Sequence, residues 1–228
     1  VCISWTYGSG GVNIGFKLAD KLKINFYDAE IFEAVLKRLE AQKDSIQDSV
    51  SYGIKPGIKK EPAHDQDANV NPSEAFIPER HLTLRQRMRE FSRFHGLPKR
   101  DAVFFNESAL LVDMAKKEDF VILGRCGDAI MANNNIPHIS IYITAPFEQR
   151  IKRAMEIDSS LTVKQARHML KHLDHVHSQY YHYYTNRNWG HSNNYDLCIN
   201  SASYGIKGSI ELIIRMLQLD DRVKQLIK

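Results

Sequence analysis

The chain has 228 residues, 43% of them hydrophobic, which suits one α/β domain with a real core. A formal net charge of only +4 excludes a polycation, so we expect no nucleic-acid partner, and no apolar run approaches the length that spans a membrane. The three cysteines (Cys2, Cys126 and Cys198) are few, odd in number and far apart, which argues against a disulfide framework and favours a reducing compartment. We therefore predict a single cytoplasmic domain over residues 1–228, and the composition leaves a homo-oligomer open.

The chain opens with an apolar run over residues 1–5, a Gly-rich turn and then an amphipathic stretch of helical spacing. This order predicts a strand that leads through a loop into a helix N-terminus, where backbone N–H groups and the helix dipole favour an anion. Glycine lets the backbone adopt positive φ angles and approach a phosphate closely. The predicted phosphate-binding residues are Gly8, Ser9, Gly10, Gly11, Val12 and Asn13.

Two other interpretations of this loop remain open. Gly8, Gly10 and the later Asp28 partly match a dinucleotide-binding fingerprint, although its third glycine would fall at Asn13. The loop is also compatible with a tight turn that binds nothing. A kinase loop normally ends in Lys followed by Ser or Thr, and this chain has Gly-Gly-Val-Asn instead.

The next elements follow an α/β pattern with one long interruption. Residues 23–28 predict a short strand that ends in Asp28, and residues 29–42 have helical spacing. Residues 43–100 hold most of the prolines and mixed charges, which indicates a partly flexible excursion with an Arg-rich helix near residues 82–94.

Regular structure then resumes in alternation. We predict helices over residues 101–117, after Pro146, over 161–177 and from about 207, and strands over 120–123, 138–144 and 196–200. This alternation predicts a doubly wound parallel sheet of about five strands. Ligands bind such sheets at the carboxyl ends of the strands, so the Gly-rich loop, Asp28, Arg125 and Thr144 should converge there.

Several charged residues are candidates for chemistry. Arg125 directly follows a buried strand and therefore needs an anion, which is either a substrate group or a carboxylate such as Asp128 or Asp28. Arg150 and Arg153 either face solvent or stabilise a transferring phosphoryl group. Three histidines of the 161–177 helix have metal-ligand spacing, but they lie opposite its apolar stripe, so we predict a solvated surface and no metal site.

Five motifs occur in a fixed order, and they are Ile3–Gly11, Leu18–Asp28, Val121–Asp128, Ala145–Arg153 and Tyr180–Asn200. Together they resemble the cytidylate kinase-like family, a branch of the P-loop nucleoside monophosphate kinases. The resemblance runs from residue 1 to about 214, interrupted by the excursion.

The resemblance implies a P-loop kinase fold with a helical lid, and transfer of the γ-phosphoryl group of ATP, with Mg²⁺, to CMP or dCMP. It implies that the Gly-rich loop holds the donor phosphates and that Asp28 and Arg125 sit at the acceptor pocket, where Asp128 is a further candidate for acceptor binding. Under the kinase hypothesis, the candidate catalytic residues are Arg150, Arg153 and Asp28. Residues 43–100 would form the acceptor side and residues 158–190 the lid, with Lys171, His175 and Arg187 as its candidate polar residues.

The chain departs from working cytidylate kinases at positions that matter. The loop lysine falls at Gly11, the first loop glycine at Trp5, and lid arginines fall near His175 and His177. Loss of one transition-state cation costs on the order of a thousandfold in rate. We therefore keep two hypotheses, a nucleotide kinase and a degenerate nucleotide-binding module that senses or scaffolds without turnover.

Overall fold

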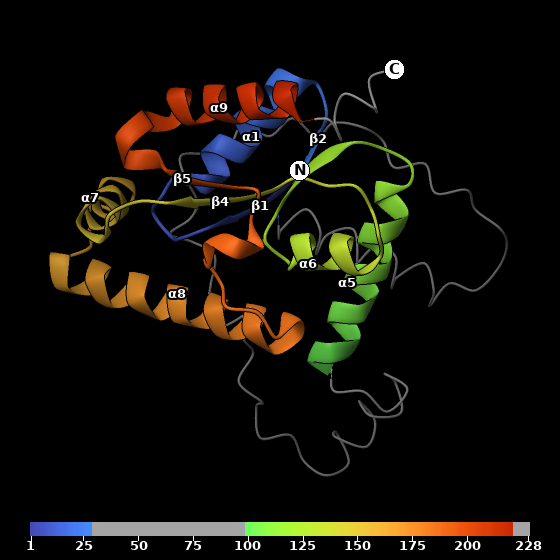
Figure 1. Cartoon of the computed structure of the whole chain (residues 1–228). Helices are drawn as coiled ribbons and strands as arrows, with labels where there is room; N and C mark the ends of the chain where they lie inside the picture. Colours follow the sequence, from blue (N-terminus) through green and yellow to red (C-terminus); the bar gives the residue numbers. More distant parts are fainter. Residues whose placement is uncertain (29–98, 221–228) are drawn as a thin grey trace, which may run out of the picture.

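The computed structural model describes residues 1–28 and 99–220 of the chain. It contains a five-stranded, fully parallel sheet in the order β2-β3-β1-β4-β5 (Figure 1). The strands are β1 (Cys2–Trp5), β2 (Asn25–Tyr27), β3 (Phe120–Leu123), β4 (Ser140–Thr144) and β5 (Leu197–Asn200). The predicted doubly wound α/β fold is confirmed.

Helices cover both faces of the sheet. They are α1 (Gly11–Leu22), α5 (Lys99–Ala115), α6 (Gly127–Asn133), α7 (Phe147–Ile157), α8 (Val163–Thr185) and α9 (Ser201–Leu219), with a short 3₁₀ turn at Ser192–Asn194. Figure 1 shows α1 and α9 together on one face and α6 and α8 on the other. None of the described helices is long and apolar enough to cross a lipid bilayer.

The central strands are buried on both faces because successive side chains point to opposite sides. In β1, Cys2 packs into the core under α5 and α6, and its neighbour Ile3 packs into the core under α1 and α9. In β3, Ile122 faces the first core, while Val121 and Leu123 face the second. This two-sided burial explains why the strands read as uninterrupted apolar runs.

The strand order excludes the dinucleotide interpretation of the Gly-rich loop. A dinucleotide fold places its second strand next to the first, so that an acidic residue there reaches the ribose. In this protein β3 lies between β1 and β2, which separates Asp28, at the end of β2, from the loop after β1.

Three helices differ from the sequence-based expectation. The short helix α6 was not predicted, because seven residues give too little periodicity. Helix α8 does not stop at residue 177 but continues through the tyrosines to Thr185, where Tyr184 stacks on Phe104 of α5 at a ring-centroid distance of 3.8 Å. Helix α9 consists of a short segment from Ser201 and a longer segment after a non-helical Gly205 (φ 64°, ψ 178°), and the longer segment begins close to the predicted residue 207. The predicted helices over residues 29–42 and 82–94 lie outside the described residues.

Candidate functional site

The Gly-rich loop connects β1 to α1 at the carboxyl edge of the sheet. Gly8 (φ 74°) and Gly10 (φ 80°) adopt left-handed conformations that only glycine tolerates without strain. Ser9 anchors the loop from within: its hydroxyl donates to the Ile143 carbonyl (3.2 Å), and its own carbonyl accepts from the Ser201 hydroxyl (2.6 Å). Helix α1 begins at Gly11, inside this loop, and the N-terminus of a helix is a favourable place for a phosphate.

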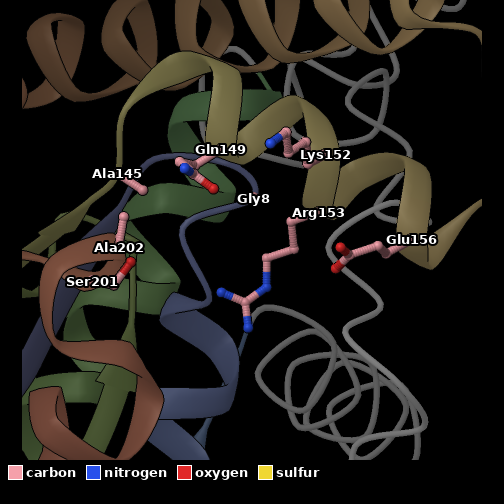
Figure 2. Close-up of a pocket in the computed structure, with 8 residues that line it drawn as sticks. All are labelled: Gly8, Ala145, Gln149, Lys152, Arg153, Glu156, Ser201 and Ala202. Atoms are coloured by element: carbon pink, nitrogen blue, oxygen red, sulfur yellow. The ribbon is translucent and has the colours of Figure 1, made fainter.

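A pocket of about 270 Å³ opens beside this loop, between α7 and the start of α9. It is lined by Gly8, Ala145, Gln149, Lys152, Arg153, Glu156, Ser201 and Ala202 (Figure 2). Figure 2 shows the Arg153 side chain extending from α7 toward the start of α1. A Cβ atom on Gly10 would lie only 2.5 Å from Arg153 Nη1, so the guanidinium packs directly on the loop.

Arg150 has a different environment from Arg153, although the two are one helical turn apart. Its side chain is buried, and both of its terminal nitrogens donate to Asp174 Oδ2 of α8, at 2.8 and 2.5 Å. It does not line the pocket. Burial raises the pKa of the Asp174 carboxyl, and the Arg150 charge acts in the opposite direction. Of the two arginines predicted to be catalytic, only Arg153 places its guanidinium against the loop.

The side chain of Trp5 occupies the place from which a loop lysine would extend. A Cβ atom on Gly11 would collide with the Cβ and Cγ atoms of Trp5. The indole also reaches toward the turn after β3, where its Cζ3 lies 3.4 Å from the position of a Cβ atom on Gly124. The large residue at the first loop position and the small residue at the lysine position are therefore two parts of one packing arrangement.

His177 of α8 packs against the same tryptophan. Its ring meets Trp5 edge-on at a centroid distance of 5.9 Å and also contacts Tyr7 and Trp189. Burial lowers the pKa of His177 to about 4, so the ring is neutral at pH 7. We call Trp5, Tyr7, His177 and Trp189 the aromatic cluster. Of its members, His177 lies near the positions at which the family resemblance predicts lid arginines.

Arg125 forms an ion pair with Glu107 of α5 (3.2 Å). Neither Asp128 nor Asp28, the carboxylates suggested by the sequence, is the partner in this pair. Glu107 was missed because it is distant in sequence and reaches Arg125 only through the packing of α5. Gly124, Arg125 and Cys126 all have positive φ angles, near 67°, 55° and 54°. Two consecutive non-glycine residues in this region store backbone strain, a feature that clusters at functional sites.

The other predicted site residues are not brought into the pocket. Asp128 is buried in α6, where its carboxylate accepts a hydrogen bond from Tyr181 (2.6 Å) and where burial raises its pKa. Lys171 and His175 are exposed on α8, and Arg187 lies just beyond its end.

Sequence reasoning missed most of the pocket wall, namely Ala145, Gln149, Lys152, Glu156, Ser201 and Ala202. The sequence contains a signal for two of these wall residues. Ala145 and Ser201 directly follow β4 and β5, and the carboxyl ends of parallel strands meet at one edge. The residues of α7 carry no such signal, because the rotation of a helix about its axis is fixed by packing.

The chain was compared with proteins of known sequence and structure. No curated protein gives a significant match. The fold is similar to the crystal structure of an uncharacterized protein from Eubacterium ventriosum, with 22% identity, a TM-score of 0.64, and 96% of this chain and 97% of that chain covered. A shikimate kinase from Bacteroides thetaiotaomicron aligns with 12% identity, a TM-score of 0.47, and 95% and 96% of the two chains covered. The model of the cytidylate kinase-like family matches residues 1–203, and the chain therefore belongs to that family.

Proposed function

We propose that the protein transfers the γ-phosphoryl group of ATP to a small nucleotide, with CMP and dCMP as the first acceptors to test. The observation that supports this most is the Arg153 guanidinium, which packs on the Gly-rich loop and lines the adjoining pocket. A phosphate-binding loop without its lysine still needs a cation nearby. Arg153, aided by Lys152, supplies that charge from α7.

Different residues of the chain would bind the donor, stabilise the transferring group and bind the acceptor. The loop from Gly8 to Asn13 offers backbone N–H groups to the donor phosphates, and the pocket between α7 and α9 accommodates the rest of the donor. Arg153 stabilises the negative charge of the transferring group, where a preorganised cation is most effective. Arg125 and Glu107 form the acceptor side, at the end of β3.

ATP and Mg²⁺ are the cofactors that membership of the family suggests. Two left-handed glycines and a helix N-terminus fit a polyphosphate chain. In residues 1–28 and 99–220, no group of three acidic, His or Cys side chains could hold a metal ion. A Mg²⁺ ion that arrives with the nucleotide is held mainly by phosphate oxygens and would neutralise their charge.

A second candidate function is nucleotide binding without turnover. The aromatic cluster favours it, because Trp5 fills the place of the lysine side chain and His177 is neutral where an arginine is expected. A protein with these replacements would still bind phosphates through backbone N–H groups. It would then act as a sensor or scaffold.

A phosphotransfer assay with ATP and CMP, dCMP, UMP or AMP separates the two candidates, run beside thermal shifts with ATP. Turnover that disappears in Arg153→Gln supports the kinase. Stabilisation by ATP without turnover selects the binding module. If ATP neither stabilises the protein nor is consumed, both proposals are wrong.

A further inference from the structure

Asp174, in the middle of α8, touches both the entrance of the Gly-rich loop and α7. Its Oδ1 accepts a hydrogen bond from the backbone N–H of Tyr7 (3.4 Å). Its Oδ2 accepts both hydrogen bonds from the buried Arg150 guanidinium. One carboxylate therefore connects α8 with the neighbouring helix α7 and with the loop after β1, which is distant in the sequence.

The backbone of α7 completes this contact from the other side. A Cβ atom on Gly8 would lie 2.9 Å from the Arg150 carbonyl oxygen, so Gly8 rests on the backbone of the same residue whose side chain Asp174 holds. Tyr7 and Gly8 are consecutive, and Gly8 is the first left-handed residue of the loop. The position of the loop relative to α7, and hence to Arg153, is fixed at these two residues.

We propose that Asp174 is a positioning residue for the phosphate-binding loop, which α8 holds in its binding conformation through the Tyr7 amide. Arg150 then has a supporting role: it neutralises and orients Asp174 instead of touching a phosphate. Arg153, three residues further along α7, keeps the pocket role. This inference builds on the proposed function, since it assigns the loop a phosphate ligand, but the hydrogen bond that it concerns exists without any ligand.

The test compares two double variants that both remove the buried charge pair. Arg150→Met/Asp174→Asn retains a side-chain carbonyl oxygen that can accept from the Tyr7 N–H, and Arg150→Met/Asp174→Leu has no acceptor. Because the pair is removed as a unit, neither variant leaves an uncompensated buried charge. Their difference isolates the bond to Tyr7.

The first measurement is hydrogen exchange at the Tyr7 and Gly8 amides by NMR, without ligand. We expect exchange about five- to tenfold faster in the Leu variant than in the Asn variant, the effect of one hydrogen bond. The second is the affinity for ATP with Mg²⁺ by calorimetry. We expect the Leu variant to bind more weakly by a similar factor, about five- to tenfold, while the two Tm values stay close.

Equal exchange at Tyr7 in the two variants would overturn the proposal, as would faster exchange spread evenly over the sheet. Faster exchange at Tyr7 combined with equal ATP affinity would also overturn it, because the loop would then not depend on Asp174 for binding. If the wild-type protein binds no ATP, the proposed function fails, and exchange at Tyr7 still decides whether Asp174 holds the loop. If one double variant does not fold, Asp174→Glu in the wild-type background replaces it. We then expect hydrogen exchange faster than in wild type at the Tyr7 amide alone. Unchanged exchange at Tyr7 would contradict the proposal.

Discussion

The packing of Trp5 on Gly11 makes a sharp prediction about which substitutions the loop tolerates. Gly11→Ala adds a single carbon that would collide with the Cβ and Cγ atoms of Trp5 and lie 2.8 Å from its Cδ1. Overpacking of this kind costs about 1–3 kcal/mol. For a chain of this size, we expect Tm to fall by roughly 2–4 °C for each kcal/mol.

The identity of residue 5 decides whether the cost disappears. Trp5→Ala leaves the Cβ atom in place, so Gly11→Ala should remain costly in that background. Trp5→Gly removes the atom, and Gly11→Ala should then be neutral or stabilising by about 0.4–1 kcal/mol, because alanine narrows the unfolded ensemble. Gly11 is the first residue of α1 and has no positive φ angle, so its backbone conformation is compatible with alanine.

Urea unfolding of the three single and two double variants, beside wild type, gives the coupling energy between positions 5 and 11. Trp5→Ala is the matched control, since it loses the indole and keeps the colliding atom. The reasoning is refuted if Gly11→Ala is tolerated beside Trp5, or if its cost is the same beside Gly at position 5. Gly11→Lys combined with Trp5→Gly then becomes the rational way to restore a loop lysine.

Three further predictions concern the charged residues. Arg153→Gln should weaken ATP binding by roughly ten- to hundredfold, because it removes charge-assisted hydrogen bonds to the phosphates. The control Arg215→Gln, on the exposed part of α9, should leave the affinity for ATP unchanged. Calorimetry with both variants measures the two affinities, and equal effects would contradict a role for Arg153. Asp174→Asn alone should lower the free energy of unfolding by about 3–5 kcal/mol, because it leaves the Arg150 charge buried without a partner charge. Adding Arg150→Met should recover much of this loss. If urea unfolding shows no recovery, the two residues do not act as a buried charge pair. The pKa of His177 lies near 4 in the folded protein, below its usual 6.5, so protonation of His177 favours the unfolded chain. The contribution of the neutral ring to the free energy of unfolding is complete above about pH 6.5. That contribution decreases by roughly 3 kcal/mol as the pH falls toward 4. His177→Phe should flatten that part of the stability profile, and an unchanged profile would show that His177 does not titrate as described.

Much of the fold followed from local patterns. The apolar runs that became β1, β3 and β4, and the Gly-rich loop between β1 and α1, were predicted near their observed places. The end of α8 was wrong because it depends on contacts between distant residues, and the prediction for α9 missed the short helical segment before Gly205. The tyrosines near residue 181 look like a polar aromatic loop in the sequence, and they are helical because α5 and α6 provide a surface for them to pack on.

The candidate site was less accessible from the sequence. Arg150 and Arg153 look equivalent in a helical pattern, and only the packing of α7 between the loop and α8 sends one to Asp174 and the other to Gly10. Arg125 was expected to need a carboxylate, and the structure supplies Glu107 from α5, the helix that precedes β3.

The sequence alone determined the alternation of strands with most of the helices along the chain, and the place of the Gly-rich loop, because apolar periodicity and glycine act over a few residues. The tertiary structure alone decided which cation meets that loop, what fills the space of the absent lysine, and which carboxylate anchors its entrance. Those choices depend on how far each helix is rotated and where it crosses the sheet edge, and such quantities are set by packing over the whole domain.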